Sequence, residues 1–212
     1  MKSVILLSGG LDSATCLYYA LSKKHHCFCL IFNYGQKHKK EIKKAVAIAK
    51  TARVEYKIVN LALPWGLGAL ADKSKTIPAF KENRKHLPST YVPGRNTLFL
   101  SFALSFAESI KANNIFIGAN SIDFSGYPDC RPQFINAYNN LLRCLNLKIK
   151  VLAPLLHLTK GQIIKLGLKL KVPYHLTWSC YRGLAAPCGK CDSCKLRAKG
   201  FREADLSDPA LR

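Results

Sequence analysis

The chain has 212 residues, of which 49% are hydrophobic and 21% are charged, the composition of a globular protein with one substantial core. The apolar run at 4–7 is too short for a signal peptide or a membrane span, so we expect a cytoplasmic protein with no membrane partner. A balance of 33 basic against 12 acidic residues gives a net charge of +21, which makes RNA a possible partner. RNA is not the favoured one, because the lysines are spread along the chain and no known RNA-binding motif accompanies them. The alternative is a basic surface that serves small anionic molecules.

Strand and helix patterns alternate along the chain. Apolar runs predict strands at 4–7, 27–33, 54–60, 115–119 and 149–153. Periodic apolar residues predict helices at 14–21, 39–51, 97–111, 132–145 and 159–170. Thr159 and Gln162 have the spacing of a capping box that opens the last of these helices. The alternation predicts a doubly wound, mostly parallel α/β sheet of about five strands, because right-handed crossovers leave few other topologies.

Two segments interrupt this pattern. Residues 61–96 contain four prolines and little periodicity, which is typical of a functional lid or a disordered segment in a compact domain, and we predict a lid loop there. Residues 178–212 form a small cysteine-rich appendage. We therefore expect a catalytic domain at 1–177, and a metal-binding segment at 178–212 packed on that domain.

The segment SGGLDS at 8–13 lies between the first strand and the first helix. Its glycines permit a tight turn close to a ligand, and the free N–H groups at the helix start form an anion site. The segment is neither a Walker A loop nor a dinucleotide-binding G-x-G-x-x-G motif. It matches the SGGxDS signature of the pyrophosphate-loop (PP-loop) ATP family, so we predict nucleotide binding there. The predicted nucleotide-binding residues are Ser8, Gly9, Gly10, Leu11, Asp12, Ser13, Ala14 and Thr15.

Four of the nine cysteines crowd into one short stretch. They are Cys180, Cys188, Cys191 and Cys194, with the spacing C-x7-C-x2-C-x2-C. Four thiolates can close a tetrahedral Zn²⁺ site without an open position for substrate, so we expect one structural zinc per chain. An iron–sulfur cluster is the competing interpretation.

Several longer strings resemble 7-cyano-7-deazaguanine synthases, which belong to the PP-loop family and act in queuosine biosynthesis. The strings are NYGQ at 33–36, YVPGRNT at 91–97, GYPDCR at 126–131, LTK at 158–160 and TWSCY at 177–181. Together with the SGGLDS loop they run over nearly the whole chain. The sequence departs from the family pattern at Asn33, where the family often has Asp, and at 68–71.

The resemblance implies an ATP-dependent carbon–nitrogen ligase. Its substrates would be 7-carboxy-7-deazaguanine, ammonia and ATP with Mg²⁺, and the reaction would pass through an adenylated carboxylate and an amide to the nitrile. Asp12, Arg95 and Lys160 are the predicted catalytic residues, because Asp12 matches the acidic residue of the family's loop and the two cations suit phosphate or carboxylate groups. The predicted substrate-binding residues are Asp123, Tyr127, Asp129 and Arg131. A homodimer is also implied.

Two alternatives remain open from the sequence. A PP-loop enzyme that adenylates a tRNA base would suit the charge and the cysteines, but such enzymes usually add an RNA-binding domain and a reactive cysteine pair. The other alternative is a zinc-stabilised nucleotide-binding or RNA-binding module that has lost catalysis, against which the intact SGGLDS and GYPDCR strings argue.

Overall fold

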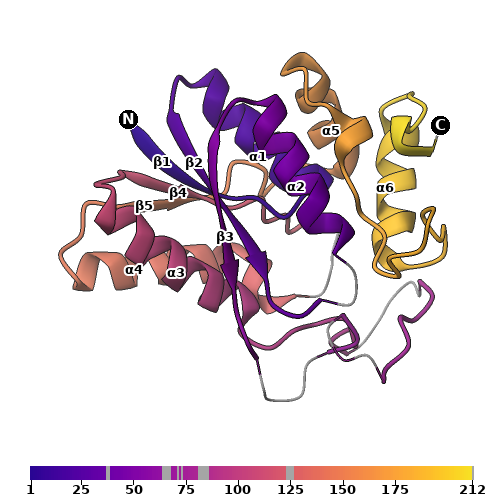
Figure 1. Ribbon diagram of the computed structural model, residues 1–212, viewed down its shortest axis with the longest axis horizontal. Coiled ribbons are helices and arrows are strands. Elements are labelled where there is room, and N and C mark those ends of the chain that lie inside the picture. The colour runs from indigo at the N-terminus through magenta and orange to yellow at the C-terminus, as the bar shows by residue number, and fades with distance from the viewer. Residues whose placement is uncertain are drawn as a thin grey trace.

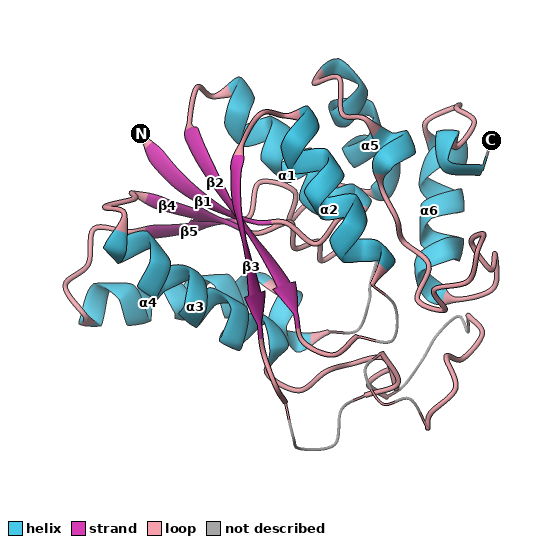
Figure 2. Ribbon diagram, in the orientation of Figure 1, coloured by secondary structure: helices cyan, strands magenta, loops and turns pink. Residues whose placement is uncertain are grey.

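A five-stranded parallel sheet forms the centre of the molecule. In this computed structural model the described residues are 1–36, 39–63, 68–70, 72, 74–80, 86–122 and 127–211. The strands, in the order β3-β2-β1-β4-β5, all run in the same direction. Their bounds are β1 Lys2–Leu6, β2 His26–Asn33, β3 Glu55–Asn60, β4 Asn114–Phe116 and β5 Lys150–Leu152. Figure 2 shows them fanned by the usual twist of a parallel sheet.

Helices cover both faces of the sheet, as Figure 1 shows. The helix bounds are α1 Leu11–Ser22, α2 Lys40–Thr51, α3 Arg95–Ser109, α4 Pro132–Cys144, α5 Lys160–Lys169 and α6 Asp192–Glu203, with short 3-10 turns at η1 Pro128–Cys130, η2 Tyr174–Leu176 and η3 Pro209–Leu211. Helices α3 and α4 lie on one face, and α1, α2 and α5 lie on the other, with α6 beside α5. No helix of the described residues is long and apolar enough to cross a membrane.

The alternation of side chains along β1 divides the core into two clusters. Val4 and Leu6 pack in the cluster that contains the buried side chains of α3 and α4. Ile5 and Leu7 pack in the cluster of α1, α2, α5 and α6. Successive residues of a strand point to opposite faces, so a wholly apolar strand belongs in a sheet that is covered on both sides.

The predicted doubly wound fold is confirmed. All ten predicted elements are present, with ends that differ by a few residues, and the capping box at Thr159 and Gln162 is formed in both directions. Strands β2 and β3 lie on one side of β1, and the chain then passes to β4 on the other side of β1. In a fold of this kind the crevice opens at this switch point, where β1 and β4 end. The SGGLDS loop follows β1 at this place. Helix α6 was not predicted as an element.

The segment between β3 and α3 has no helix or strand among its described residues. Ala69, Leu70 and Ile77 are nevertheless buried in the α3–α4 cluster. The backbone N–H of Phe80 donates to the carbonyl of Lys190 at 2.9 Å. The described part of the segment thus packs against the body of the molecule and the C-terminal segment. Its action as a lid stays a prediction.

Helices α5 and α6 pack closely because Gly200 has no side chain. A Cβ at Gly200 would lie 2.3 Å from Cγ and 2.8 Å from Cβ of Lys160. These atoms are near the backbone of α5 and cannot swing away. The position of the Lys160 side chain therefore depends on a glycine in the other helix.

We expect Gly200→Ala to destabilise the protein by about 1–2 kcal/mol, since the clash of an overpacked helix contact outweighs the ~1 kcal/mol that alanine gains in helix propensity. Thermal unfolding followed by circular dichroism measures this, as a fall of several degrees in the midpoint. Lys199→Ala, at an exposed position of the same helix, is the control and should shift the midpoint by less than about a degree. An unchanged midpoint in Gly200→Ala would contradict the close packing.

Candidate active site

The SGGLDS loop is held by its own serines. The Ser8 and Ser13 hydroxyls lie 3.0 Å apart, and the Ser13 hydroxyl donates to the carbonyl of Gly10 at 3.1 Å. Gly9 has a φ of +81°, in the left-handed region that favours glycine. The turn directs the start of α1 at the crevice, where its N–H groups and the helix dipole favour an anion.

Helix α2 lies against the back of this loop. A Cβ at Gly9 would lie 2.4 Å from the carbonyl oxygen of Glu41 and 2.8 Å from the backbone N of Ala45. The carbonyl of Gly9 accepts a hydrogen bond from the backbone N–H of Trp178 at 2.9 Å. Gly9 is thus required both for its backbone conformation and for the contact with α2.

Asp12 and Lys160 form an ion pair at the edge of the crevice. The Lys160 ammonium donates to both carboxylate oxygens of Asp12, at 2.9 Å and 2.8 Å. The side chain of Lys160 is 10% exposed and that of Asp12 is 30% exposed. The pair joins the loop to the start of α5 and places a cation beside the loop.

A cavity of about 290 Å³ brings the predicted motifs together. It is lined by residues of six of the strings named above, and their most polar members are Ser8, Asp12, Ser13, Gln36, Arg95, Asn96, Tyr127, Lys160, Ser179 and Tyr181. The predicted catalytic residues Asp12, Arg95 and Lys160 therefore share one cavity. Their catalytic roles stay predictions.

Arg95, the first residue of α3, is a fixed charge in the cavity. Burial would lower the pKa of Arg95, but Tyr34, Tyr127, Cys130 and Asp129 around it raise that pKa, so the guanidinium stays charged. Burial raises the pKa of Cys130 to about 11, which keeps this thiol protonated at neutral pH. The cavity can therefore attract an anion through Arg95 but does not hold an activated cysteine at 130.

The predicted substrate-binding residues lie in different surroundings. Tyr127 lines the cavity, and its hydroxyl lies 2.8 Å from that of Thr90. Asp129 is buried outside the lining, where its carboxylate accepts from the backbone N–H of Asn96 at 3.2 Å. Arg131 is exposed and does not line the cavity. Asp123 lies outside the described residues.

The predicted nucleotide-binding residues also separate. Ser8, Gly10, Leu11, Asp12 and Ser13 line the cavity, whereas Gly9, Ala14 and Thr15 do not. Thr15 is turned into the core, where its hydroxyl donates to the carbonyl of Leu11 at 2.9 Å and meets the Tyr174 hydroxyl at the same distance. Ala14 is also fully buried. Any contact of Ala14 or Thr15 with a nucleotide would have to come from the backbone.

Sequence reasoning did not single out several lining residues. Tyr34 and Gln36 follow β2, where the Gln36 side chain accepts from the Tyr34 N–H at 2.9 Å and donates to the carbonyl of Phe32. Tyr181 follows the first cysteine of the cluster. All three stand in strings that carried the family resemblance, so their membership of these strings could have marked them as site residues. Glu41 stands in none of them and enters the cavity through the packing of α2.

The four cysteines of the C-terminal segment gather around one point. Their sulfur atoms all lie within 4.8 Å of one another, and those of Cys188 and Cys194 are 4.0 Å apart. Tetrahedral coordination at a metal–sulfur distance of about 2.3 Å requires sulfurs roughly 3.8 Å apart. Backbone N–H groups point at the sulfurs, from Cys188 to Cys180 at 3.3 Å and from Cys191 to Cys188 at 3.4 Å. The cluster can therefore bind a metal ion.

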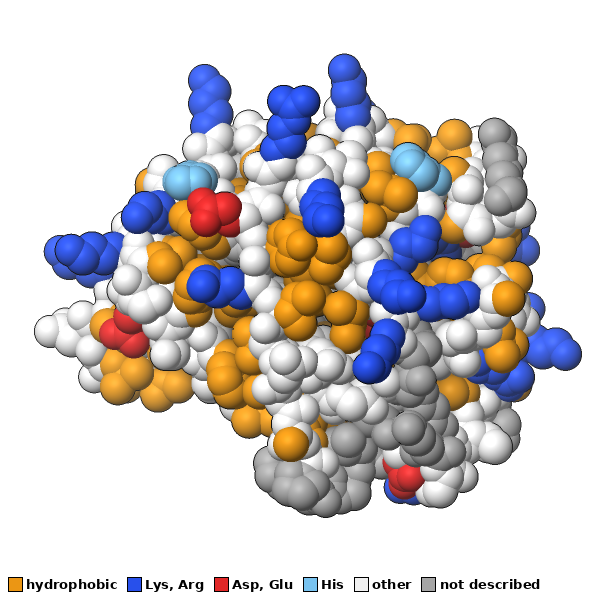
Figure 3. All heavy atoms as spheres, in the orientation of Figure 1, with side chains coloured by type: hydrophobic (Ala, Val, Ile, Leu, Met, Phe, Trp, Pro, Cys, Tyr) orange, Lys and Arg blue, Asp and Glu red, His pale blue; other side chains and the backbone are white. Residues whose placement is uncertain are grey.

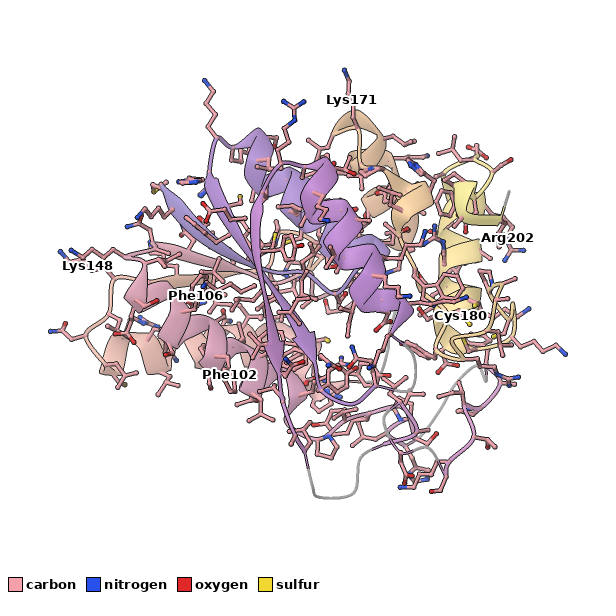
Figure 4. All side chains as sticks on the ribbon, viewed as in Figure 1. Phe102, Phe106, Lys148, Lys171, Cys180 and Arg202 are labelled. Carbon is pink, nitrogen blue, oxygen red and sulfur yellow. The ribbon has the colours of Figure 1, made fainter. Side chains whose placement is uncertain are left out.

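Hydrogen bonding within this cluster favours a thiolate at Cys191. The hydrogen bond between Cys191 and Cys194 lowers the pKa of Cys191 and raises that of Cys194, and backbone N–H groups and Cys188 also lower the pKa of Cys191. Deprotonated cysteine is the form that binds metal. Cys180 lies on the right-hand side of Figure 4, at the base of α6.

Comparison with known proteins places the chain in a family. A family model described as queuosine biosynthesis protein QueC matches residues 2–205. The chain belongs to the QueC family. This confirms the resemblance that the sequence strings indicated.

Two relatives and one solved structure illustrate the similarity. The 7-cyano-7-deazaguanine synthase of Thermoplasma volcanium is 51% identical over 218 residues, covering 98% of this chain and 89% of its own. That of Coxiella burnetii strain RSA 493 is 50% identical over 220 residues, covering 98% and 96%. A 4-thiouridine synthetase in complex with RNA and ATP has a TM-score of 0.55 at 18% identity, covering 99% of this chain and 52% of its own. The last likeness shows the fold alone.

We expect Cys191→Ser to lose the bound metal, because three thiolates leave the tetrahedral site incomplete. Inductively coupled plasma mass spectrometry of the purified protein should find about one metal ion per chain in the unaltered protein and well under half of that in the variant. The same measurement identifies the metal as zinc or iron. Cys144→Ser, at an exposed cysteine outside the cluster, should keep the full metal content; equal metal content in both variants would contradict the site.

Proposed function

We propose that this chain is a 7-cyano-7-deazaguanine synthase. It converts 7-carboxy-7-deazaguanine and ammonia to the nitrile at the expense of ATP, as a step of queuosine biosynthesis. The observation that carries the proposal is the meeting of six separate sequence strings around one cavity. The two relatives described above, which are 51% and 50% identical to this chain over 98% of its length, are both named 7-cyano-7-deazaguanine synthase.

The described residues suit the first chemical demand, which is to turn a carboxylate oxygen into a leaving group. The SGGLDS loop and the start of α1 offer N–H donors and the Ser8 and Ser13 hydroxyls to the phosphates that leave as pyrophosphate. Lys160 and Arg95 provide positive charge on two sides of the cavity. Mg²⁺ bound with ATP would neutralise phosphate charge. Most of the catalytic effect would then come from positioning and electrostatic stabilisation.

We assign a structural role to the metal at the cysteine cluster, and we propose zinc. Four sulfur ligands leave no open coordination position, which is typical of structural zinc sites. We propose that the enzyme works in the reducing cytosol, where cysteines remain thiols that can bind metal.

The net positive charge of the chain suits the anionic substrates of the proposed reaction. Figure 3 shows Lys and Arg side chains over the upper part and the right-hand side of the face in view, with few acidic ones between them. Such a surface raises the local concentration of ATP and of a carboxylate substrate. A tRNA-modifying role is the second candidate from the sequence, and no observation on the described residues favours it.

The assay for this proposal is mass spectrometry of the metal-loaded protein incubated with 7-carboxy-7-deazaguanine, ammonium, Mg²⁺ and ATP. The expected products are the nitrile and AMP. Unchanged substrate under these conditions would overturn the proposal and make tRNA the next substrate to test.

Lys160→Met should lower the rate of nitrile formation by about 10²–10³-fold, because it removes a cation that stabilises charge on the transferring group. Methionine keeps a long apolar side chain against Gly200, so the fold should survive. Lys165→Met, at an exposed position of the same helix, is the matched control and should keep the full rate. A rate within threefold of the original in Lys160→Met would remove Lys160 from the catalytic machinery.

We propose that the enzyme is a homodimer. Phe102 of α3, Leu141 of α4 and Leu145 directly after α4 are 43%, 47% and 53% exposed, which leaves apolar area on this side of the sheet. Phe102 and Phe106 are labelled on α3 in Figure 4. Sedimentation equilibrium should give twice the chain mass, and Phe102→Glu should shift the mass toward the monomer. A monomer in the unaltered protein would contradict the proposal.

A further inference from the structure

Glu41 is an acidic side chain of the cavity that neither the resemblance nor the sequence motifs singled out. It stands at the start of α2 and lines the cavity with partial burial. Its backbone carbonyl is the atom nearest to a Cβ at Gly9. The carboxylate therefore lies within one side-chain length of the nucleotide loop.

The surroundings of Glu41 leave its carboxylate available. Among the described residues, no ion pair or hydrogen bond occupies it. Asp12, the other carboxylate among the described lining residues, has both oxygens bonded to Lys160. No histidine stands among the described lining residues, and Cys130 holds its proton. Glu41 is thus the acceptor that remains for a proton inside the cavity.

The proposed reaction needs such an acceptor. Turning a carboxylate into a nitrile removes every proton from the nitrogen that ammonia brings. A positioned base within hydrogen-bond reach typically accelerates such a transfer by 10²–10⁴-fold. We propose that Glu41 is the general base that takes the protons from the substrate nitrogen, an inference that rests on the proposed function.

The proton transfers balance in three steps. Ammonia attacks the carbonyl carbon of the acyl adenylate, the carbon–nitrogen bond forms, one N–H proton passes to Glu41, and the carbon–oxygen bond to AMP breaks. The amide oxygen then attacks the α-phosphorus of a second ATP, pyrophosphate leaves, and a second proton passes to Glu41. Loss of the third proton accompanies release of AMP and closes the carbon–nitrogen triple bond. Glu41 returns each proton to solvent before the next step.

The surroundings of Glu41 bring the pKa of its carboxyl group into the range that a general base needs. Burial raises its pKa to about 7, against the opposing effect of the Arg95 guanidinium. Arg95 approaches from α3, Tyr34 from the end of β2, and Tyr181 from the C-terminal segment. Its neighbour Lys40 is directed away, to the carbonyls of Leu184 and Ala185. A base with a pKa near the working pH transfers protons most effectively.

The test separates adenylation from proton removal. Exchange of labelled pyrophosphate into ATP, with 7-carboxy-7-deazaguanine and no ammonium, measures adenylation alone. Conversion of the amide to the nitrile with ATP and no ammonium, followed from pH 5.5 to 9, measures proton removal without interference from the titration of ammonium. Both are run on the unaltered protein, on Glu41→Gln, and on Glu55→Gln, which alters an exposed glutamate of β3.

We expect Glu41→Gln to keep pyrophosphate exchange within threefold while amide conversion falls about 10²–10³-fold. In the unaltered protein kcat/KM for the amide should rise with pH around a midpoint near 7, and this rise should vanish in Glu41→Gln. Glu55→Gln should match the unaltered protein. An equal loss of exchange, or a pH profile that persists in Glu41→Gln, would overturn the role of Glu41. An unaltered protein that makes no nitrile would instead refute the proposed function.

Thermal unfolding gives a readout that does not depend on activity. The pKa of Glu41 in the folded protein, about 7, lies above its value of 4.5 in an exposed chain. The fold therefore favours the protonated carboxyl, and this stabilisation is complete below pH 4.5 and is lost as the pH rises through 7. Glutamine cannot ionise, so the unfolding midpoint of Glu41→Gln should exceed that of the unaltered protein at pH 8 and match it near pH 4.5. Equal midpoints at pH 8 would contradict the buried position of the carboxylate.

Discussion

The ion pair of Asp12 and Lys160 is the interaction on which the site depends. Moving charges out of water is costly, and a partly buried pair is retained only where good geometry and further hydrogen bonds offset that cost. Here one ammonium bonds both carboxylate oxygens, and Gly200 of α6 gives the lysine stem its space. Helix α6 is fixed in turn by Arg197, which donates twice to Asp208, at 2.6 Å and 2.8 Å. The nucleotide loop is thus tied through α5 to the C-terminal segment.

The sheet and five of its helices were predictable from the sequence because their buried residues form local patterns of apolar side chains. Strands that are apolar throughout belong in a sheet covered on both faces, and the Thr159 and Gln162 spacing marks a helix start by direct hydrogen bonding. Helix α6 escaped prediction because it has no such pattern. Its buried face consists of Cys194, Arg197, Gly200 and Phe201, of which only Phe201 is a large apolar side chain. An arginine is buried there because Asp208 and the Thr177 hydroxyl satisfy it, which are tertiary contacts.

The residues of the site were predictable mainly from family resemblance. The SGGLDS loop, Arg95 and Lys160 could be named because they stand in strings that resemble the family, whereas charge alone does not distinguish two cations among 33 basic residues. Asp129 shows the limit: its spacing in GYPDCR does not tell whether the carboxylate meets a ligand or the start of α3, and in the fold it bonds the N–H of Asn96. Glu41 shows the converse, since it stands in a lysine-rich helix and reaches the cavity only because Gly9 lets α2 approach.

The C-terminal segment joins the metal cluster to the nucleotide loop within a few residues. The Trp178 N–H donates to the carbonyl of Gly9 at 2.9 Å, and the Trp178 ring nitrogen donates to the carbonyl of Cys180 at 2.8 Å. Tyr181, the next residue, lines the cavity. A metal bound by the four sulfurs would fix the position of Cys180, and through it the wall of the cavity and the turn at Gly9. The cluster would then need no open coordination position to affect the proposed reaction, because it would act on the geometry of the loop to which we assign the phosphates.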